Sequence, residues 1–379
     1  MKTIRKIIKR MLVFIGIVVT VIVFTGVLFV NLSPQFGGSA SKEQQKKYAK
    51  SPNNKDGKFV NLGGVKQEMS AGDIFKAIGG MFKSIPNALP KSAIQIQKTD
   101  SINIADYKSS KTRFIWFGHS AFLFQIEGKN ILIDPMFSDV PAPHPLLGNK
   151  RFSKELPIEI EKLSKIDAVL ISHDHYDHLD YESIKKLKHK VDKFFTLLGL
   201  SNHLKTWGVK EDKITELDWW QETTFENLTF VSTPSQHFSG RGLGDRDKTL
   251  WCSWIVKSEN EKIFFSGDSG YGPHFKEIGN IHGPFDFAMM ECGQYNELWS
   301  EIHMFPEETA QASIDIKAKK MMPIHWGAFK LAQHSWTDPI QRVVKKAEEL
   351  NVALIIPEIG KSIILEDETL EQTNWWSKY

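Results

Sequence analysis

The most distinctive feature of the hydrophobic pattern is an uninterrupted apolar run near the amino terminus. Residues 11–30 read MLVFIGIVVTVIVFTGVLFV, twenty positions without a charge. At 1.5 Å per residue, a helix of this length covers about 30 Å, the thickness of a membrane's hydrocarbon core. Five of the first ten residues are basic, so the positive-inside rule keeps residues 1–10 cytoplasmic and sends the following chain across the membrane. We expect a retained anchor, and the alternative is a signal peptide cleaved near GSA (38–40).

Residues 31–110 are polar and poorly patterned, and they predict a linker. Within this segment, SKEQQKKYAKSPNNKDGK has the composition of a flexible tether. Further on, five apolar side chains fall at helical spacing: Ile74, Phe75, Ile78, Met81 and Phe82. They predict a short helix docked on the main domain. The alternative is an amphipathic helix that lies against lipid near the mouth of the active site.

Residues 111–379 alternate between strand and helix patterns and predict one folded domain. Strands are indicated by FIWFGHSAFLFQI, KNILIDP, AVLIS, LTFVS, SWIV, KIFFS, FAMM and ALIIP, and helices by DYESIKKLKHK, PEETAQASIDIKAKK and QRVVKKAEEL. This order predicts an α/β (α+β) fold in which sheets are sandwiched between helix layers. The chain therefore divides into a basic cytoplasmic segment (1–10), an anchor (11–30), a linker (31–110) and a folded domain (111–379).

Composition excludes several classes of protein. The chain of 379 residues is 41% hydrophobic and 25% charged, which is typical of a globular protein and excludes a disordered chain or a multispan membrane protein. Two cysteines exclude a disulfide scaffold. The net charge of +3 comes from the first ten residues, since the remainder carries 43 basic and 45 acidic residues. A basic body that binds nucleic acid is therefore not indicated.

The strongest chemical signal is the sequence HDHYDH at residues 173–178, directly after the predicted buried strand AVLIS. A strand end fixes the backbone, and a tight turn can aim successive side chains in different directions. His173 and His175 can share one metal ion, which leaves Asp177 and His178 to turn towards a second. Neutral imidazole and carboxylate suit zinc, and to a lesser degree iron or manganese.

Three more candidate ligands stand in equivalent places, each just past a hydrophobic strand. His237 follows LTFVS, Asp268 follows KIFFS, and His325 follows MMPI. Histidines and aspartates scattered at random would not all follow strand ends. Together with HDHYDH, these residues predict a site for more than one metal ion.

The motif and its downstream ligands resemble those of the metallo-β-lactamase superfamily. The blocks WFGHSAFLF, ISHDHYDHLD, SQHFSGR, GDSGYGP and PIHWGAFKLA resemble N-acyl-phosphatidylethanolamine-hydrolysing phospholipase D and its bacterial relatives. The resemblance covers about residues 111–367 and implies a four-layer αββα sandwich with the site at its edge. It also implies two Zn²⁺ ions, or other divalent transition metals, and a homodimer. The implied ligands are His173, His175 and His237 for one ion, Asp177, His178 and His325 for the other, and Asp268 as a bridge.

The resemblance implies a membrane-anchored phosphodiesterase that acts on a phospholipid such as N-acyl-phosphatidylethanolamine. A hydroxide between the two metals would attack phosphorus, with Asp177, Asp268 and His303 as catalytic residues. We expect the domain to lie on the outer, periplasmic side of a bacterial-type inner membrane. One alternative is a zinc lactonase or small phosphodiester hydrolase of the envelope. A weaker alternative is a zinc-binding module without catalytic activity.

Four further residues are expected around the site. His119 and Asp134 would support the ligands from behind, Asp134 by orienting a histidine ring, although both could equally be turn residues. Arg241 would contact phosphate or cover the surface. Trp299 would line an acyl groove or serve only in packing. The remaining histidines have no ligand context.

Overall fold

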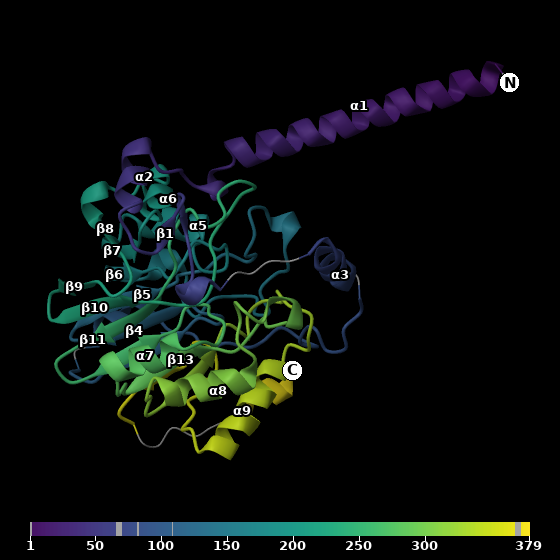
Figure 1. Ribbon diagram of the computed structural model, residues 1–379. Coiled ribbons are helices and arrows are strands. Elements are labelled where there is room, and N and C mark those ends of the chain that lie inside the picture. Colours follow the sequence, from purple (N-terminus) through teal and green to yellow (C-terminus); the bar gives the residue numbers. More distant parts are fainter. Residues whose placement is uncertain (1, 66–69, 82, 108, 368–372) are drawn as a thin grey trace.

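Two sheets face each other in the body of the protein (Figure 1). The structure is a computed structural model that describes residues 2–65, 70–81, 83–107, 109–367 and 373–379. The seven-stranded sheet has the order β15-β3-β4-β5-β6-β7-β8, with bounds Ser362–Ile364, Arg113–Trp116, Phe122–Ile126, Lys129–Ile133, Ile166–Leu170, Val191–Leu197 and Ile214–Leu217. The six-stranded sheet has the order β14-β13-β12-β11-β10-β9, with bounds Met321–Ile324, Phe287–Glu291, Lys262–Phe265, Ser253–Lys257, Leu228–Thr233 and Glu222–Phe225.

Aromatic side chains fill the space between the sheets. Phe114 of β3 stacks on Phe287 of β13 with ring centroids 5.2 Å apart, and Phe195 of β7 meets Phe230 of β10 at 4.8 Å. These side chains belong to one large buried cluster. Burial of both sheet faces explains why the strands read as continuous apolar runs and not as alternating ones.

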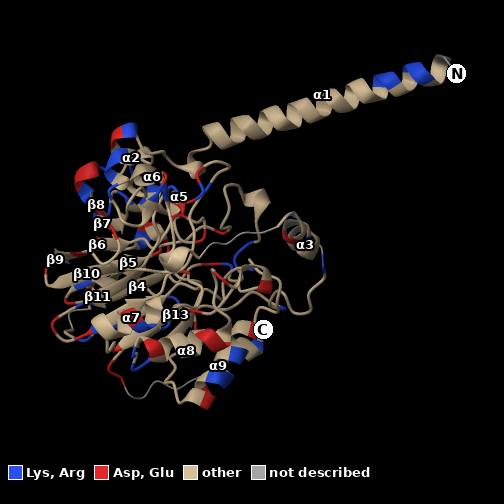
Figure 2. Ribbon diagram, in the orientation of Figure 1, with Lys and Arg blue, Asp and Glu red and all other residues tan. Residues whose placement is uncertain are grey.

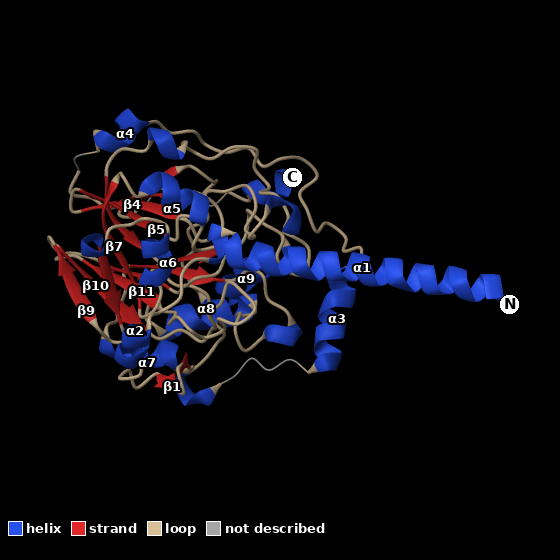
Figure 3. Ribbon diagram, turned by 90° about the horizontal axis from the view of Figure 1, so that it is seen from above, coloured by secondary structure: helices blue, strands red, loops and turns tan. Residues whose placement is uncertain are grey.

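Helices cover the outer faces of both sheets, which gives four layers (Figure 3). Apolar side chains of three helices pack on the seven-stranded sheet: α4 (Ser101–Ala105), α5 (Tyr181–Leu187) and α6 (Ser201–Thr206). Three others pack on the six-stranded sheet: α7 (His274–Ile281), α8 (Pro306–Asp315) and α9 (Asp338–Leu350). The predicted αββα arrangement is confirmed.

Two of the expected strands differ in the structure. FIWFGHSAFLFQI is split between β3 and β4 by a turn at Gly118 and His119, which have φ of 86° and 56°. ALIIP makes only an isolated bridge between Met321 and Leu354. The backbone N–H of Ile355 donates to Met321, but residue 323 in β14 is a proline and has no N–H for the next bond.

Helix α1 (Lys2–Leu32) projects away from the body (Figure 1). It is apolar and long enough to cross a membrane, and all of its most apolar window is exposed. Its basic side chains lie at the free end (Figure 2). The helix therefore matches the expected membrane segment in length and composition.

The expected flexible tether is wrong, because residues 33–62 are folded against the body. They form a short 3₁₀ turn (Pro34–Phe36), helix α2 (Lys42–Tyr48) and a hairpin of β1 (Asn54–Lys55) and β2 (Lys58–Phe59). Tyr48 and Phe59 are buried in the core, and Asn53 donates a 3.0 Å hydrogen bond to Asp218. Side chains and backbone groups that hold a segment through scattered contacts leave no periodic pattern in the sequence. The polarity of this segment alone therefore indicated a tether. The four-part division of the chain stays a prediction.

Helix α3 (Ala71–Met81) forms where helical spacing was expected. Gln333 donates a 3.1 Å hydrogen bond to the carbonyl of Ala77, which ties the helix to the body. Phe75 is exposed, and Phe82 lies outside the described residues. The contact with Gln333 favours the docked helix over one held only by lipid.

The close packing of residues 34–38, which we call the anchor exit, is testable by adding a single methyl group. A Cβ on Gly38 would lie 2.0 Å from Thr206 Oγ1 and 2.5 Å from the carbonyl oxygen of Asn202. We expect Gly38→Ala to cost about 1–3 kcal/mol of local stability. Amide hydrogen exchange in residues 34–62 should become faster. Gly244→Ala is the control, because no atom lies within 4 Å of its Cβ, and equal exchange in both variants would contradict the packing.

Candidate metal centre

The candidate ligands all lie in loops that follow strands at one edge of the two sheets. Residues 173–178 follow β6, His237 follows β10, Asp268 follows β12 and His325 follows β14. His119 lies in the turn between β3 and β4. The two sheets thus hold loops that are far apart in sequence at one place, on a rigid scaffold.

The structure brings the predicted residues into two adjoining groups, in each of which the potential ligand atoms lie within 4.8 Å of one another. The first consists of His173, His175, His237 and Asp268, and the second of His119, Asp177, His178 and His325. Asp268 faces both groups: its carboxylate oxygens lie 3.1 Å from His178 Nε2, 3.3 Å from His325 Nε2 and 3.8 Å from His237 Nε2. This is the arrangement expected of a bridging carboxylate.

The spacing of the ligand atoms fits a small cation. His175 Nδ1 lies 3.0 Å from His173 Nε2 and 3.1 Å from His237 Nε2. Neighbouring ligands of a tetrahedral zinc ion with bonds of 2.0–2.1 Å are about 3.3 Å apart. In addition, His178 Nε2 and Asp268 Oδ1 are buried without a hydrogen-bond partner, although they lie 3.1 Å apart. The donor set therefore fits a metal ion.

The outer ring nitrogens of the histidines are held by hydrogen bonds. Nδ1 of His178 lies 2.7 Å from Asp134 Oδ2, and Nδ1 of His237 lies 3.0 Å from the carbonyl oxygen of Ile302. An acceptor at Nδ1 fixes the proton there and leaves the Nε2 lone pair pointing inward, as a metal ligand requires. Asp134 also accepts from the backbone N–H and hydroxyl of Ser172. Asp134 thus lies where the sequence predicted, against a ligand histidine.

Buried carboxylates dominate the electrostatics of the site. Burial lowers the pKa of His173 and His237 well below the ordinary value, so both rings are neutral. Burial acts in the same direction on His325, but Asp268 and Asp177 outweigh it and raise the pKa of His325 to about 10. The same two carboxylates raise the pKa of His178 well above its ordinary value. The carboxylates thus require positive charge beside them, which protonated imidazoles or metal ions can supply.

Strained turns and backbone hydrogen bonds join loops of the two sheets at the site. His119, Asp134 and His325 have φ of 56°, 40° and 66°, values that side chains other than glycine rarely adopt. The backbone N–H of His325 donates to the carbonyl of His119, and that of His119 donates to Trp326. His119 Nε2 lies 2.8 Å from Asp177 Oδ2. His119 thus contacts Asp177 directly, and its supporting role stays a prediction.

A cavity of about 510 Å³ opens over the metal-ligand groups. Its floor contains ligand residues from both groups, and its walls carry apolar, aromatic and polar side chains from several loops. The wall residues are Phe238, Arg246, Gln294, Trp299, Ile302, His303 and Leu331. Trp299 and His303 thus line this cavity, and their roles towards a substrate stay predictions.

Arg241 is the predicted residue that the structure places elsewhere. Its side chain is buried and does not line the cavity. It donates hydrogen bonds to the backbone carbonyls of Gln35, Asp174 and Leu179. Both expected roles, phosphate contact and surface cover, are therefore wrong. Arg246, five residues later, is the arginine at the cavity.

Sequence reasoning missed two residues that support the site. Glu291 is fully buried at the end of β13, with Oε1 2.6 Å from His303 Nδ1 and 3.4 Å from His325 Nδ1. Its position directly after FAMM is the same signal that identified Asp268. Asn61 exchanges hydrogen bonds with the backbone of His237. Nothing in its polar surroundings indicates this contact.

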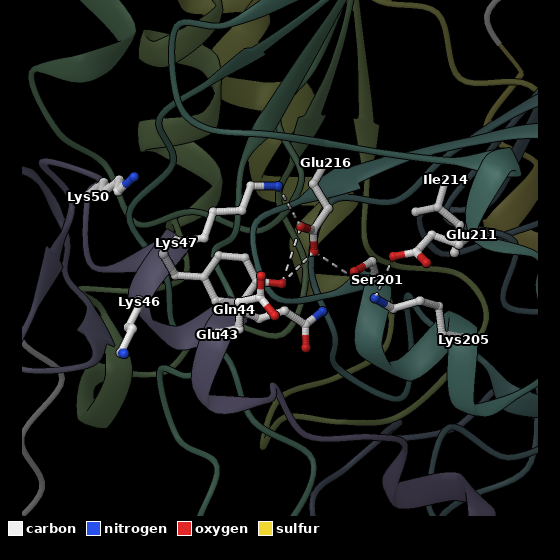
Figure 4. Close-up of a pocket in the computed structure, with 11 residues that line it drawn as sticks. Glu43, Gln44, Lys46, Lys47, Lys50, Ser201, Lys205, Glu211, Ile214 and Glu216 are labelled. Carbon is white, nitrogen blue, oxygen red and sulfur yellow. Dashed lines mark hydrogen bonds and ion pairs between the residues drawn. The ribbon is translucent and has the colours of Figure 1, made fainter.

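A larger cleft, of about 730 Å³, lies between α2 and the α6–β8 region and is not the site (Figure 4). Two ion pairs cross or border it: Lys47 with Glu216 at 4.0 Å, and Lys205 with Glu211 at 3.3 Å. Glu216 also accepts from the hydroxyl of Tyr48 and the backbone N–H of Ser201. No histidine lines this cleft among the described residues. Its polar groups are structural contacts of α2.

Comparison with known proteins assigns the chain to a family. Residues 129–326 match the Beta-lactamase superfamily domain. An uncharacterised protein of Mycobacterium tuberculosis is 37% identical over 86% of this chain and 87% of its own length. The N-acyl-phosphatidylethanolamine-hydrolysing phospholipase D 1 of Caenorhabditis elegans is 32% identical over 66% of this chain and 75% of its own length. A metallo hydrolase of Ignicoccus hospitalis shares the fold, with a TM-score of 0.52 and 20% identity over 68% of this chain and all of that one.

The fold and the ligand cluster define a metal-dependent hydrolase. The chain belongs to the metallo-β-lactamase superfamily.

The contact between Asp134 and His178 predicts how metal binding responds to a change of one atom. In Asp134→Asn, the side-chain amide would donate to Nδ1, and the proton on the ring would move to Nε2, where it blocks the metal. We expect metal affinity to fall about 10–100-fold. Competition with a chromophoric chelator measures this, with exposed His189→Asn as the control. Unchanged affinity in the Asp134 variant would contradict the orienting role.

Proposed function

We propose that the protein is a membrane-anchored phosphodiesterase that uses two zinc ions to hydrolyse a phospholipid such as N-acyl-phosphatidylethanolamine. Water would add to phosphorus, the bond from phosphorus to the ethanolamine oxygen would break, and N-acylethanolamine and phosphatidate would result. The observation that carries the proposal is the pairing of the two ligand groups with an apolar-walled cavity directly above them.

The proposed ligands divide between two ions. His173, His175 and His237 would hold one, Asp177, His178 and His325 the other, and Asp268 would bridge them. Two such ions supply a nucleophilic hydroxide near neutral pH and neutralise charge on the phosphoryl oxygens. The chain's own residues would then orient the substrate and handle protons. Contacts with His119 and His325 fix the position of the Asp177 carboxylate.

His303 is the residue we propose to act on the leaving group. Its Nδ1 lies 2.6 Å from the buried carboxylate of Glu291, and the side chain lines the cavity. Because Nδ1 is occupied, Nε2 is the atom left to donate a proton to the departing ethanolamine oxygen. Glu291 would fix the orientation of the ring.

The cavity wall supports a substrate with both a charge and an acyl chain. Phe238, Trp299, Ile302 and Leu331 offer apolar surface, and Arg246 brings a cation to the same cavity. The Arg246 guanidinium lies 4.3 Å from the centroid of the Phe238 ring. A phosphodiester of a lipid matches this combination, and the similarity to a phospholipase D of that substrate class supports it.

Contacts between the anchor exit and the body support an amino-terminal helix that is retained and not cleaved. Carbonyls of Pro34 and Gln35 accept from Trp207 Nε1 and Arg241 Nε, and Gly38 N–H donates to His203 Nδ1. Cleavage near GSA (38–40) would strip these partners from buried side chains, at a free-energy cost for each. We propose a retained anchor with the domain on the outer side of the inner membrane. A homodimer stays a prediction.

Substrate turnover tests the proposed function. We expect the full-length protein, reconstituted in vesicles that contain N-acyl-phosphatidylethanolamine, to carry about two zinc ions per chain and to release N-acylethanolamine. Elemental analysis and mass spectrometry measure the two quantities. Asp268→Asn should lose metal and activity together, whereas His189→Asn should keep both. Opening of a lactone without phospholipid cleavage would favour the lactonase, and bound metal without any turnover would favour the non-catalytic module.

His303 should be separable from the metal ligands. We expect His303→Gln to lower kcat about 10²–10⁴-fold because the proton donor is lost. Zinc content should stay at the level of the unchanged protein, since His303 is not a proposed ligand. Parallel measurement of kcat and bound zinc distinguishes the two roles. A variant that loses zinc as well would make His303 part of the metal site.

A further inference from the structure

Three leucines in two loops are among the most exposed large apolar side chains of the body. Leu243 is 93% exposed, Leu146 is 87% exposed and Leu147 is 63% exposed. Single exposed leucines are common on soluble proteins and need no explanation. These three differ because one of their loops contacts the last turns of α1 and the other contacts the anchor exit that follows it. We refer to Leu146, Leu147 and Leu243 as the leucine rim.

The loop that carries Leu146 and Leu147 meets the last turns of α1. The ring of Phe29 lies 6.1 Å from that of His144, edge to face. His144 caps the short 3₁₀ turn Pro145–Leu147 by accepting a 3.2 Å hydrogen bond from the backbone of Leu146. The two leucines therefore lie beside the point where the chain would leave the bilayer.

The loop that carries Leu243 meets the anchor exit. Arg241 Nε donates to the carbonyl of Gln35 at 2.8 Å, and a Cβ on Gly242 would lie 3.6 Å from the Phe36 ring. Trp207 Nε1 donates to the carbonyl of Pro34, and His203 Nδ1 accepts from the backbone N–H of Gly38. With the anchor exit bonded at three of its five residues, α1 has little freedom to swing relative to this loop.

We propose that the leucine rim inserts into the lipid bilayer around α1 and holds the body in a fixed orientation on the membrane. This inference rests on the proposed function, because it requires α1 to be embedded. A bilayer is the occupant that the contacts favour, since the rim adjoins a twenty-residue apolar helix that has no other cover in the described structure.

The orientation would bring the catalytic cavity to the lipid surface. Arg246, which lines the cavity, follows Leu243 by three residues in the same loop. The backbone N–H of Gly240, at the start of that loop, donates a 2.8 Å hydrogen bond to Asp174 in the HDHYDH motif. Insertion of Leu243 would thus set the height of Arg246 at the level of the phosphates. A lipid would then reach the metal groups without leaving the interface.

Depth-dependent quenching tests the rim directly. The two native cysteines are buried, so a fluorophore can be attached to Leu147→Cys or Leu243→Cys in the full-length protein. The control is Ile281→Cys on α7, which is 55% exposed and lies on the opposite side of the body from α1 (Figures 1 and 3). In phosphatidylcholine–phosphatidylglycerol vesicles with spin-labelled lipid, we expect several-fold stronger quenching at 147 and 243 than at 281. Equal quenching at all three positions overturns the rim.

A charge on the rim tests its role in orientation. We expect Leu243→Asp to lower turnover of vesicle-bound phospholipid several-fold and to leave hydrolysis of a soluble phosphodiester unchanged. Ile281→Asp should change neither rate, and equal losses in both variants overturn the orienting role. Failure of the protein to sediment with vesicles overturns the anchor and the rim together. Quenching at 243 without phospholipid cleavage supports the rim while contradicting only the proposed substrate.

Discussion

The carboxylate of Asp268 is the constraint around which the rest of the site is organised. It is buried at the end of β12 and lies within 3.8 Å of ring nitrogens from His173, His178, His237 and His325. A buried carboxylate is stable only when positive charge or hydrogen-bond donors surround it. The surrounding imidazoles come from loops of both sheets, so the charge of Asp268 is satisfied only when the two sheets are correctly paired. The site is thus complete only in the folded pairing of the two sheets.

That coupling explains why the outer contacts of the ligands are so complete. Asp134 holds His178 and Ser172, Ile302 holds His237, and reciprocal backbone bonds join the turns at His119 and His325. Residues with positive φ occupy three of these places, a local cost that the surrounding packing must offset. A site prepared in this way loses little freedom when its cations bind. Preorganisation of the protein would therefore contribute to metal affinity in addition to ligand identity.

The clustering of the candidate ligands could be predicted from sequence because each follows a strongly apolar strand, and strand ends of neighbouring strands meet at one edge. Glu291 carries the same signal and was recognised only in the structure, because a single glutamate has no motif around it. Arg241 and Asn61 were beyond prediction, since their partners are backbone groups distant in the chain. The structure of the segment around Tyr48 could not be predicted for the same reason. Its polar groups bond particular partners such as Glu216, and composition does not identify such partners. Periodic features were predictable, and aperiodic polar contacts were not.

Asp174 connects the candidate metal centre to the anchor exit. Within HDHYDH, the rings of His173 and His175 turn inward, whereas the carboxylate of Asp174 accepts from Gly240 and Thr249 and lies 3.4 Å from His203 Nε2. His203 in turn accepts from Gly38 in the anchor exit, and Arg241 bonds both Gln35 and the backbone of Asp174. One six-residue loop therefore carries candidate ligands on one side and is linked on the other to the anchor exit, through Arg241, His203 and the contact of Tyr176 with Phe36. The anchor exit is bonded to the body at Pro34, Gln35 and Gly38, so it forms a fixed connection and not a free tether.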